Sequence, residues 1–240
     1  HETDWQEPRP LLRAGLYWPG RDRPSLDDLR AVWRTAAPVA AIVFYRALLQ
    51  AGNLKPVDAL IAALQEQGIN PLPLYCNSLK DAQSAEVVRG LLTEASCEIV
   101  LNATGFALSA PGAARAETPF DACDGPVLQV VFSGGNAEAW EKGTTGLSAR
   151  DIAMNVALPE VDGRVLSRAV SFKGAARWDP ATQTSVVAYE PQADRIDFVA
   201  ALAANWLRLR RLPTAKRRLA VVLANYPNRD GRLGNGVGLD

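Results

Sequence analysis

The sequence predicts an α/β fold, Rossmann-like or flavodoxin-like, in which helices cover both faces of a parallel sheet. Two observations carry this prediction. Short apolar runs of strand length alternate with longer amphipathic segments, as where 39–45 precedes 56–66. The apolar runs also lack the polar–apolar alternation of a half-exposed strand, which is typical of strands that are buried on both faces of a sheet.

Capping and turn residues mark the individual elements. Ser25 is a candidate N-cap for a helix that we expect to reach about Thr35. Pro56 opens the next helix and Gly68 follows its end, the usual positions of these two residues. Further helices are expected at 84–94, at 137–141, from 148 to just before Pro159 and at 194–210, and strands at 12–18, 39–45, 71–75, 97–102, 127–132, 163–172, 185–189 and 219–223.

The chain has 240 residues, of which 48% are apolar, enough for a substantial core. We expect two subdomains. The first, 1–110, is flavodoxin-like, and the second, 111–240, is also α/β and continues in a longer protein. The segment 104–126 is rich in Ala, Gly, Pro and Ser and predicts a long loop at the boundary, and loops of this length are often functional.

Composition excludes several classes of protein. Lys and Arg together number 26 and so do Asp and Glu, which leaves no basic excess for nucleic acid. No apolar run is long enough to cross a membrane. Cys76, Cys97 and Cys123 form no CxxC pair, so neither a zinc site nor a disulfide framework is predicted, and a cytoplasmic location is expected. The polar start of the chain, without Met, suggests that it begins inside a longer polypeptide or after processing.

The common catalytic motifs are also missing. The one histidine, His1, argues against a Ser-His-Asp triad or a histidine metal site. No GxxxxGK[ST] motif is present for ATP. The glycine-rich segment 234–238 has the wrong spacing for a dinucleotide fingerprint and is interpreted as a loop.

Two polar segments are candidates for a site. In 158–163, Glu160 and Asp162 follow a helix; the alternative is a turn with solvated acids. The segment 225–231 directly follows the expected strand 219–223, and open α/β sheets bind ligands at the carboxyl ends of their strands. The alternative there is an Asx-turn.

Both polar segments belong to longer strings that resemble the CobN-type large subunits of aerobic cobaltochelatase, a family related to the large subunit of magnesium chelatase. The resemblance covers most of the chain, and 164–173 is more similar to the cobalt branch. The matching strings are 41–54 (AIVFYRALLQAGNL), 70–80, 100–112 (VLNATGFALSAPG), 126–136 (PVLQVVFSGGN), 147–173 and 221–240.

The resemblance implies ATP-dependent insertion of Co2+ into hydrogenobyrinic acid a,c-diamide, in aerobic cobalamin biosynthesis. The large subunit of the family binds this corrinoid tetrapyrrole, and Co2+ is a substrate. Two smaller subunits form an ATPase motor that binds ATP and Mg2+, which agrees with the missing P-loop in this chain.

Metal insertion needs acids that ligate Co2+ and accept the ring protons, together with groups that grip the substrate. We assign the catalytic role to Glu160, Glu190 and Asp162, with Glu160 and Glu190 as transient metal ligands. Basic and amide side chains suit the carboxylate and amide arms of the substrate. These candidates are Arg46, Asn102, Arg150, Asn155, Lys173, Tyr189, Arg195, Asn225, Asn228, Arg229 and Asn235, and the aromatic candidates for packing on the ring are Tyr45, Phe106, Phe132, Tyr189 and Tyr226.

Three alternatives stay open at this point. The chain is a non-catalytic scaffold or docking module of a chelatase subunit, a magnesium-branch chelatase subunit, or a Rossmann-type nucleotide-binding enzyme. Tetrapyrrole titration, metal preference and nucleotide binding would distinguish them.

Overall fold

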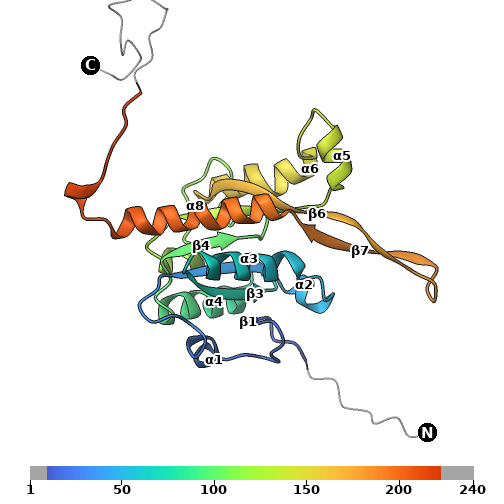
Figure 1. Cartoon of the computed structure of the whole chain (residues 1–240), viewed down its shortest axis with the longest axis horizontal. Helices are drawn as coiled ribbons and strands as arrows, with labels where there is room; N and C mark the ends of the chain where they lie inside the picture. Colours follow the sequence, from blue (N-terminus) through green and yellow to red (C-terminus); the bar gives the residue numbers. More distant parts are fainter. Residues whose placement is uncertain (1–9, 223–240) are drawn as a thin grey trace, which may run out of the picture. The chain divides into compact units, whose positions relative to one another are not determined.

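The computed structural model describes residues 10–222, without the side chains of 175–177, and its strands form one seven-stranded sheet (Figure 1). The order is β1-β3-β2-β4-β5-β6-β7. The five inner strands are parallel, and their order β3-β2-β4-β5-β6 is that of flavodoxin-like folds. The strands are β1 (Ala14–Leu16), β2 (Val39–Tyr45), β3 (Asn70–Cys76), β4 (Ile99–Asn102), β5 (Val127–Ser133), β6 (Val165–Asp179) and β7 (Thr184–Pro191).

Helices cover both faces of the sheet, as predicted. On one face α3 (Lys55–Glu66) and α8 (Ala193–Arg211) pack against Ile42 and Phe44 of β2. On the other, α1 (Leu26–Arg30) and α4 (Ala82–Glu94) pack against Val43. The remaining helical segments are α2 (Arg46–Gln50), η1 (Pro119–Ala122), α5 (Ala137–Lys142), α6 (Ala149–Ile152), η2 (Ala153–Ala157), α7 (Leu158–Val161) and η3 (Thr214–Lys216).

The two edge strands are antiparallel to their neighbours, unlike the parallel inner strands. β1 runs antiparallel to β3, and β7 runs antiparallel to β6. The connection between β6 and β7 is a short turn, and such a turn can join only antiparallel strands. The resulting hairpin extends beyond the rest of the sheet (Figure 1).

One predicted helix end is wrong. We expected the helix that starts after Ser148 to stop before Pro159, but helical structure runs on to Val161. The π-helix η2 makes this continuation possible. Its last turn closes with the N–H of Leu158 on the carbonyl of Ala153, so Pro159 sits in the first turn of α7, where a missing N–H costs little.

The expected strand 219–223 is not a strand where the structure describes it. Residues 219–222 have no regular structure, and the side chains of Leu219 and Val222 are both 92% exposed. A strand needs a neighbour to satisfy its backbone, and none of the described strands pairs with this run. The helix expected to reach Thr35 also ends earlier, at Arg30.

The expected division near residue 110 falls between β4 and β5, which are hydrogen-bonded neighbours in the sheet. Among the described residues, those up to Leu207 form one compact unit, and those from Arg208 onward belong to a second. None of the helices within 10–222 has the length and apolar character needed to cross a membrane.

Candidate functional site

The strand order creates a crevice at the carboxyl ends of β2 and β4. The chain leaves β2 through α3 on one face to reach β3, then crosses through α4 on the other face to reach β4. The connections therefore diverge beside β2, and open α/β sheets bind their ligands at such a switch point. Two adjoining cavities lie there, and Tyr45 and Phe106 line both.

The larger one, which we call cavity A, has a volume of about 430 Å³. Its walls combine aromatic rings with basic and amide groups. The ring centroids of Phe132 and Tyr189 are 5.9 Å apart, and the Lys173 amine lies 5.3 Å from the centroid of Tyr189. Burial, and then the charge of Asp151, raise the pKa of Tyr189, so its phenol stays protonated at neutral pH. Cavity A therefore offers apolar faces and positive charge to the same ligand.

Asp151 organises one wall of cavity A. Its buried carboxylate accepts hydrogen bonds from the hydroxyl of Ser133 (2.7 Å), the N–H of Gly134 (3.1 Å) and the side-chain amide of Asn155 (3.3 Å). These contacts tie the turn after β5 to the helix that carries Asn155. The carboxylate is thus committed to holding the wall in place.

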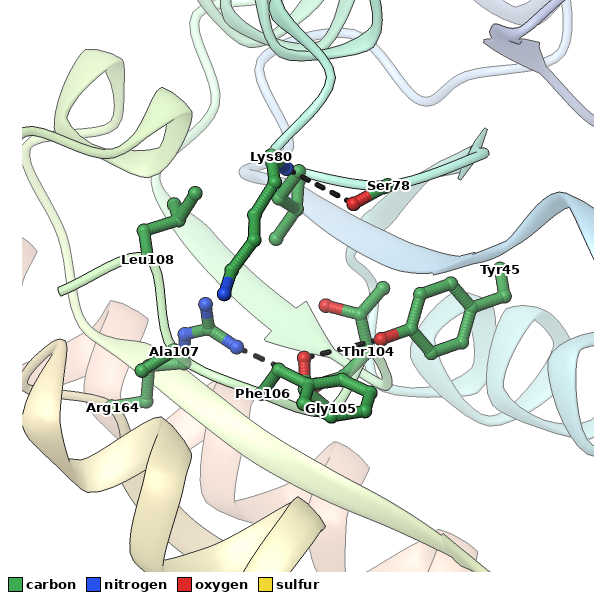
Figure 2. A pocket seen from close by; sticks show the side chains of 10 residues that line it. Tyr45, Ser78, Lys80, Thr104, Gly105, Phe106, Ala107, Leu108 and Arg164 are labelled. Atoms are coloured by element: carbon green, nitrogen blue, oxygen red, sulfur yellow. Dashed lines mark hydrogen bonds between the residues drawn. The ribbon is translucent and has the colours of Figure 1, made fainter. Parts of the chain in front are cut away.

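The smaller one, cavity B, has a volume of about 250 Å³ and lies among the ends of β2, β3 and β4. Figure 2 shows Lys80, from the segment after β3, and Arg164 directed toward the same space. The hydroxyl of Tyr45 donates to the carbonyl of Gly105 at 3.2 Å. Phe106, which lines both cavities, has a positive φ of 64°, an uncommon backbone conformation for a non-glycine residue.

A buried ion pair fixes the position of Arg164 in the lining of cavity B. The Arg164 guanidinium donates to Asp162 at 2.8 Å, and both side chains are 1% exposed. Asp162 also accepts the N–H groups of Leu108 (2.8 Å) and Ser109 (2.9 Å). Burial raises the pKa of Asp162, but these hydrogen bonds and the charge of Arg164 outweigh it and bring the pKa below its usual value.

The structure gathers part of the predicted site in one place. Four of the predicted substrate-binding residues line cavity A: Arg150, Asn155, Lys173 and Tyr189. Besides Tyr189, three further predicted aromatic residues line it: Tyr45, Phe106 and Phe132.

The other predicted substrate-binding residues make internal contacts where they are described. Asn102 is fully buried and bonded to Thr104 and Gln129. Arg46 donates to the carbonyl of Leu11, and Arg195 donates to the carbonyl of Ala169. Asn225, Tyr226, Asn228, Arg229 and Asn235 lie outside the described residues.

The predicted acids do not converge. Glu160 is exposed on α7, and Glu190 forms an ion pair with Lys55 at 2.5 Å. Neither lines cavity A or cavity B. Within residues 10–222 no three His, Cys, Asp or Glu side chains cluster as a metal site would require. The carboxylate of Asp162 accepts hydrogen bonds from the N–H groups of Leu108 and Ser109.

Sequence reasoning missed Lys80, Arg164 and Asp151. A signal for Lys80 existed, because 77–80 follows the carboxyl end of β3 just as 225–231 follows an expected strand. Arg164 pairs with Asp162 only two positions away, and Asp151 bonds Asn155 four positions away. The sequence could not show, however, that these side chains are buried and line cavities A and B.

Comparison with known proteins gives consistent matches over the whole chain. The CobN/Magnesium Chelatase family model matches residues 1–240. The chain is 51% identical to the aerobic cobaltochelatase subunit CobN of Sinorhizobium sp, over 98% of this chain and 19% of that protein. It is 27% identical to the magnesium-chelatase subunit ChlH of Oryza sativa, over 95% of this chain and 16% of that protein.

A solved structure is similar too. The catalytic subunit of cobaltochelatase from Mycobacterium tuberculosis superposes with a TM-score of 0.73 at 30% identity, over 98% of this chain and 19% of that one. This chain therefore spans about a fifth of the length of the relatives that it matches.

Proposed function

Since this chain belongs to the CobN/magnesium chelatase family, we propose that it is part of the tetrapyrrole-binding large subunit of an aerobic cobaltochelatase. The reaction is ATP-dependent insertion of Co2+ into hydrogenobyrinic acid a,c-diamide. The higher identity to the CobN subunit, 51% against 27% for the ChlH subunit, favours cobalt over magnesium.

Cavity A is the observation that carries this proposal. Its volume, about 430 Å³, lies within the range of about 300–1,000 Å³ that is usual for small-molecule sites. A tetrapyrrole has broad apolar faces and a rim of polar arms. The rings of Phe132 and Tyr189 suit such a face, and Lys173 and Arg150 suit acidic arms. In this proposal the chain contributes one wall of the substrate site.

The proposed division of labour in the complex is consistent with the sequence of this chain. Its sequence contains no P-loop motif for ATP. We propose that two smaller subunits form the motor, bind ATP and Mg2+, and act on the large subunit in the cytoplasm.

Substitution of Lys173 by Met tests the tetrapyrrole site. We expect the full-length subunit with this change to bind the corrinoid about tenfold more weakly, because one charge-assisted contact is lost. Quenching of tryptophan fluorescence measures the affinity. Lys142→Met is the matched control, because Lys142 pairs with Glu138 on α5 and lines neither cavity.

The outcomes separate the alternatives. Equal affinities for the Lys173→Met and Lys142→Met variants would remove cavity A from the site. If the unaltered subunit bound no corrinoid, this would favour the scaffold alternative. Preference for Mg2+ and a porphyrin would favour the magnesium branch.

Proton transfer by Glu160 and Glu190 stays a prediction. Because Glu160 is exposed, Glu160→Gln should leave the free energy of unfolding unchanged. Equal rates of cobalt insertion by the Glu160→Gln and unaltered complexes would remove Glu160 from the mechanism.

A further inference from the structure

Cavity B has an uncompensated positive charge. Two of its lining residues, Lys80 and Arg164, are cationic, and none is acidic. The amine of Lys80 forms no ion pair with any side chain in the described part of the chain. Figure 2 shows it directed toward the guanidinium of Arg164. Two like charges that face one space favour an anion between them.

The hydrogen-bonding capacity of Arg164 is also incompletely used. One nitrogen donates to Asp162 at 2.8 Å, and a second is 3.5 Å from the carbonyl of Thr104. The third, Nε, is buried without a hydrogen-bond partner among residues 10–222. A buried N–H group without a hydrogen-bond partner is costly unless a ligand or a water satisfies it.

Asp162 balances the charge of Arg164 but not that of Lys80. Its two oxygens already accept the N–H groups of Leu108 and Ser109 as well as the guanidinium of Arg164. It lies outside the lining of cavity B. Within the described residues, the charge of Lys80 is therefore the one of the two that no carboxylate balances.

The size and position of cavity B indicate which anion it takes. At about 250 Å³ it is too small for a tetrapyrrole, whereas a side arm that ends in a carboxylate fits. Leu79 and Leu108 provide apolar walls for the methylene groups of such an arm. Because Tyr45 and Phe106 line both cavities, a ring in cavity A can extend an arm into cavity B.

We propose that cavity B is the subsite for a carboxylate side arm of the tetrapyrrole, bound by Lys80 and Arg164. This inference rests on the proposed function, and it adds the recognition of one free acid group. In it, Arg164 supplies a fixed, buried charge, and Lys80 closes over the carboxylate from the segment after β3.

The test compares two corrinoids with the full-length subunit. One is hydrogenobyrinic acid a,c-diamide, and the other is the same ring with every arm amidated. We expect Lys80→Met to weaken binding of the acid about tenfold and binding of the amide less than twofold, because only the acid loses a charged contact. Lys80→Arg retains the charge, so its dissociation constant for the acid should stay within threefold of that of the unaltered subunit. Lys142→Met should bind both ligands as tightly as the unaltered subunit.

The outcomes distinguish a failure of this inference from a failure of the proposed function. If Lys80→Met binds the acid as tightly as the unaltered subunit, or loses equal affinity for both ligands, cavity B is not a carboxylate subsite. Binding by the unaltered subunit would meanwhile uphold the proposed function. If the unaltered subunit binds neither ligand, the proposed function and this inference both fail. Because Lys80 is exposed, the variant folds normally, which circular dichroism checks.

Discussion

Asp162→Asn lowers the free energy of unfolding by about 3–5 kcal/mol, because it leaves the buried guanidinium of Arg164 without its counter-charge. The amide also replaces an acceptor of the Leu108 and Ser109 N–H groups with a weaker one. Denaturant unfolding followed by tryptophan fluorescence measures the loss.

The matched control is Glu138→Gln, which breaks an exposed ion pair with Lys142. It should lower the free energy of unfolding by less than about 1 kcal/mol. A similarly small loss for Asp162→Asn would contradict the buried-pair interpretation. The double variant Asp162→Asn with Arg164→Met removes both charges. Its loss of unfolding free energy should be smaller than the sum of the losses in the two single variants.

The same pair predicts a pH dependence. The pKa of Asp162 in the folded chain lies below its value in the unfolded chain, which is about 3.9. Between the two values the unfolded chain binds more protons, so stability rises with pH there. The contribution is complete above the unfolded pKa and is lost as the pH falls through the folded pKa. The stabilities of the unaltered chain and Asp162→Asn should therefore converge below about pH 4.

Gly105→Ala is expected to cost about 1–3 kcal/mol, because it overpacks the boundary between the cavities. A Cβ at Gly105 would lie 2.9 Å from the carbonyl oxygen of Met154 and 3.0 Å from Oδ1 of Asn155. The backbone must then move away from η2, which weakens the bond from the Phe106 N–H to the Met154 carbonyl (2.8 Å). We expect weaker corrinoid binding as well as a lower unfolding free energy.

Gly90→Ala is the control for Gly105→Ala. Gly90 lies inside α4, and a Cβ there meets nothing within 4 Å. Alanine should therefore stabilise the helix by about 0.5–1 kcal/mol. If Gly105→Ala were as stable as Gly90→Ala, the close approach at the cavity boundary would not be a constraint.

Local signals were sufficient for much of the fold. The run 39–45 is apolar on both sides because β2 contacts helices on both faces of the sheet. Ser25 caps α1 with a capping box, and Pro56 lies in the first turn of α3. Such signals are short-range, so one stretch of sequence contains all of the interacting groups.

By itself, the sequence determined the alternation of strands and helices typical of a Rossmann-like or flavodoxin-like fold, the absence of common catalytic motifs and the resemblance to the chelatase family. The tertiary structure alone decided which polar residues share a cavity. Lys55 neutralises Glu190 from 135 positions away, and Asp162 is engaged by Leu108 and Ser109, more than 50 positions earlier. Pairings over such separations depend on how the sheet brings its loops together, and no local pattern of residues encodes that.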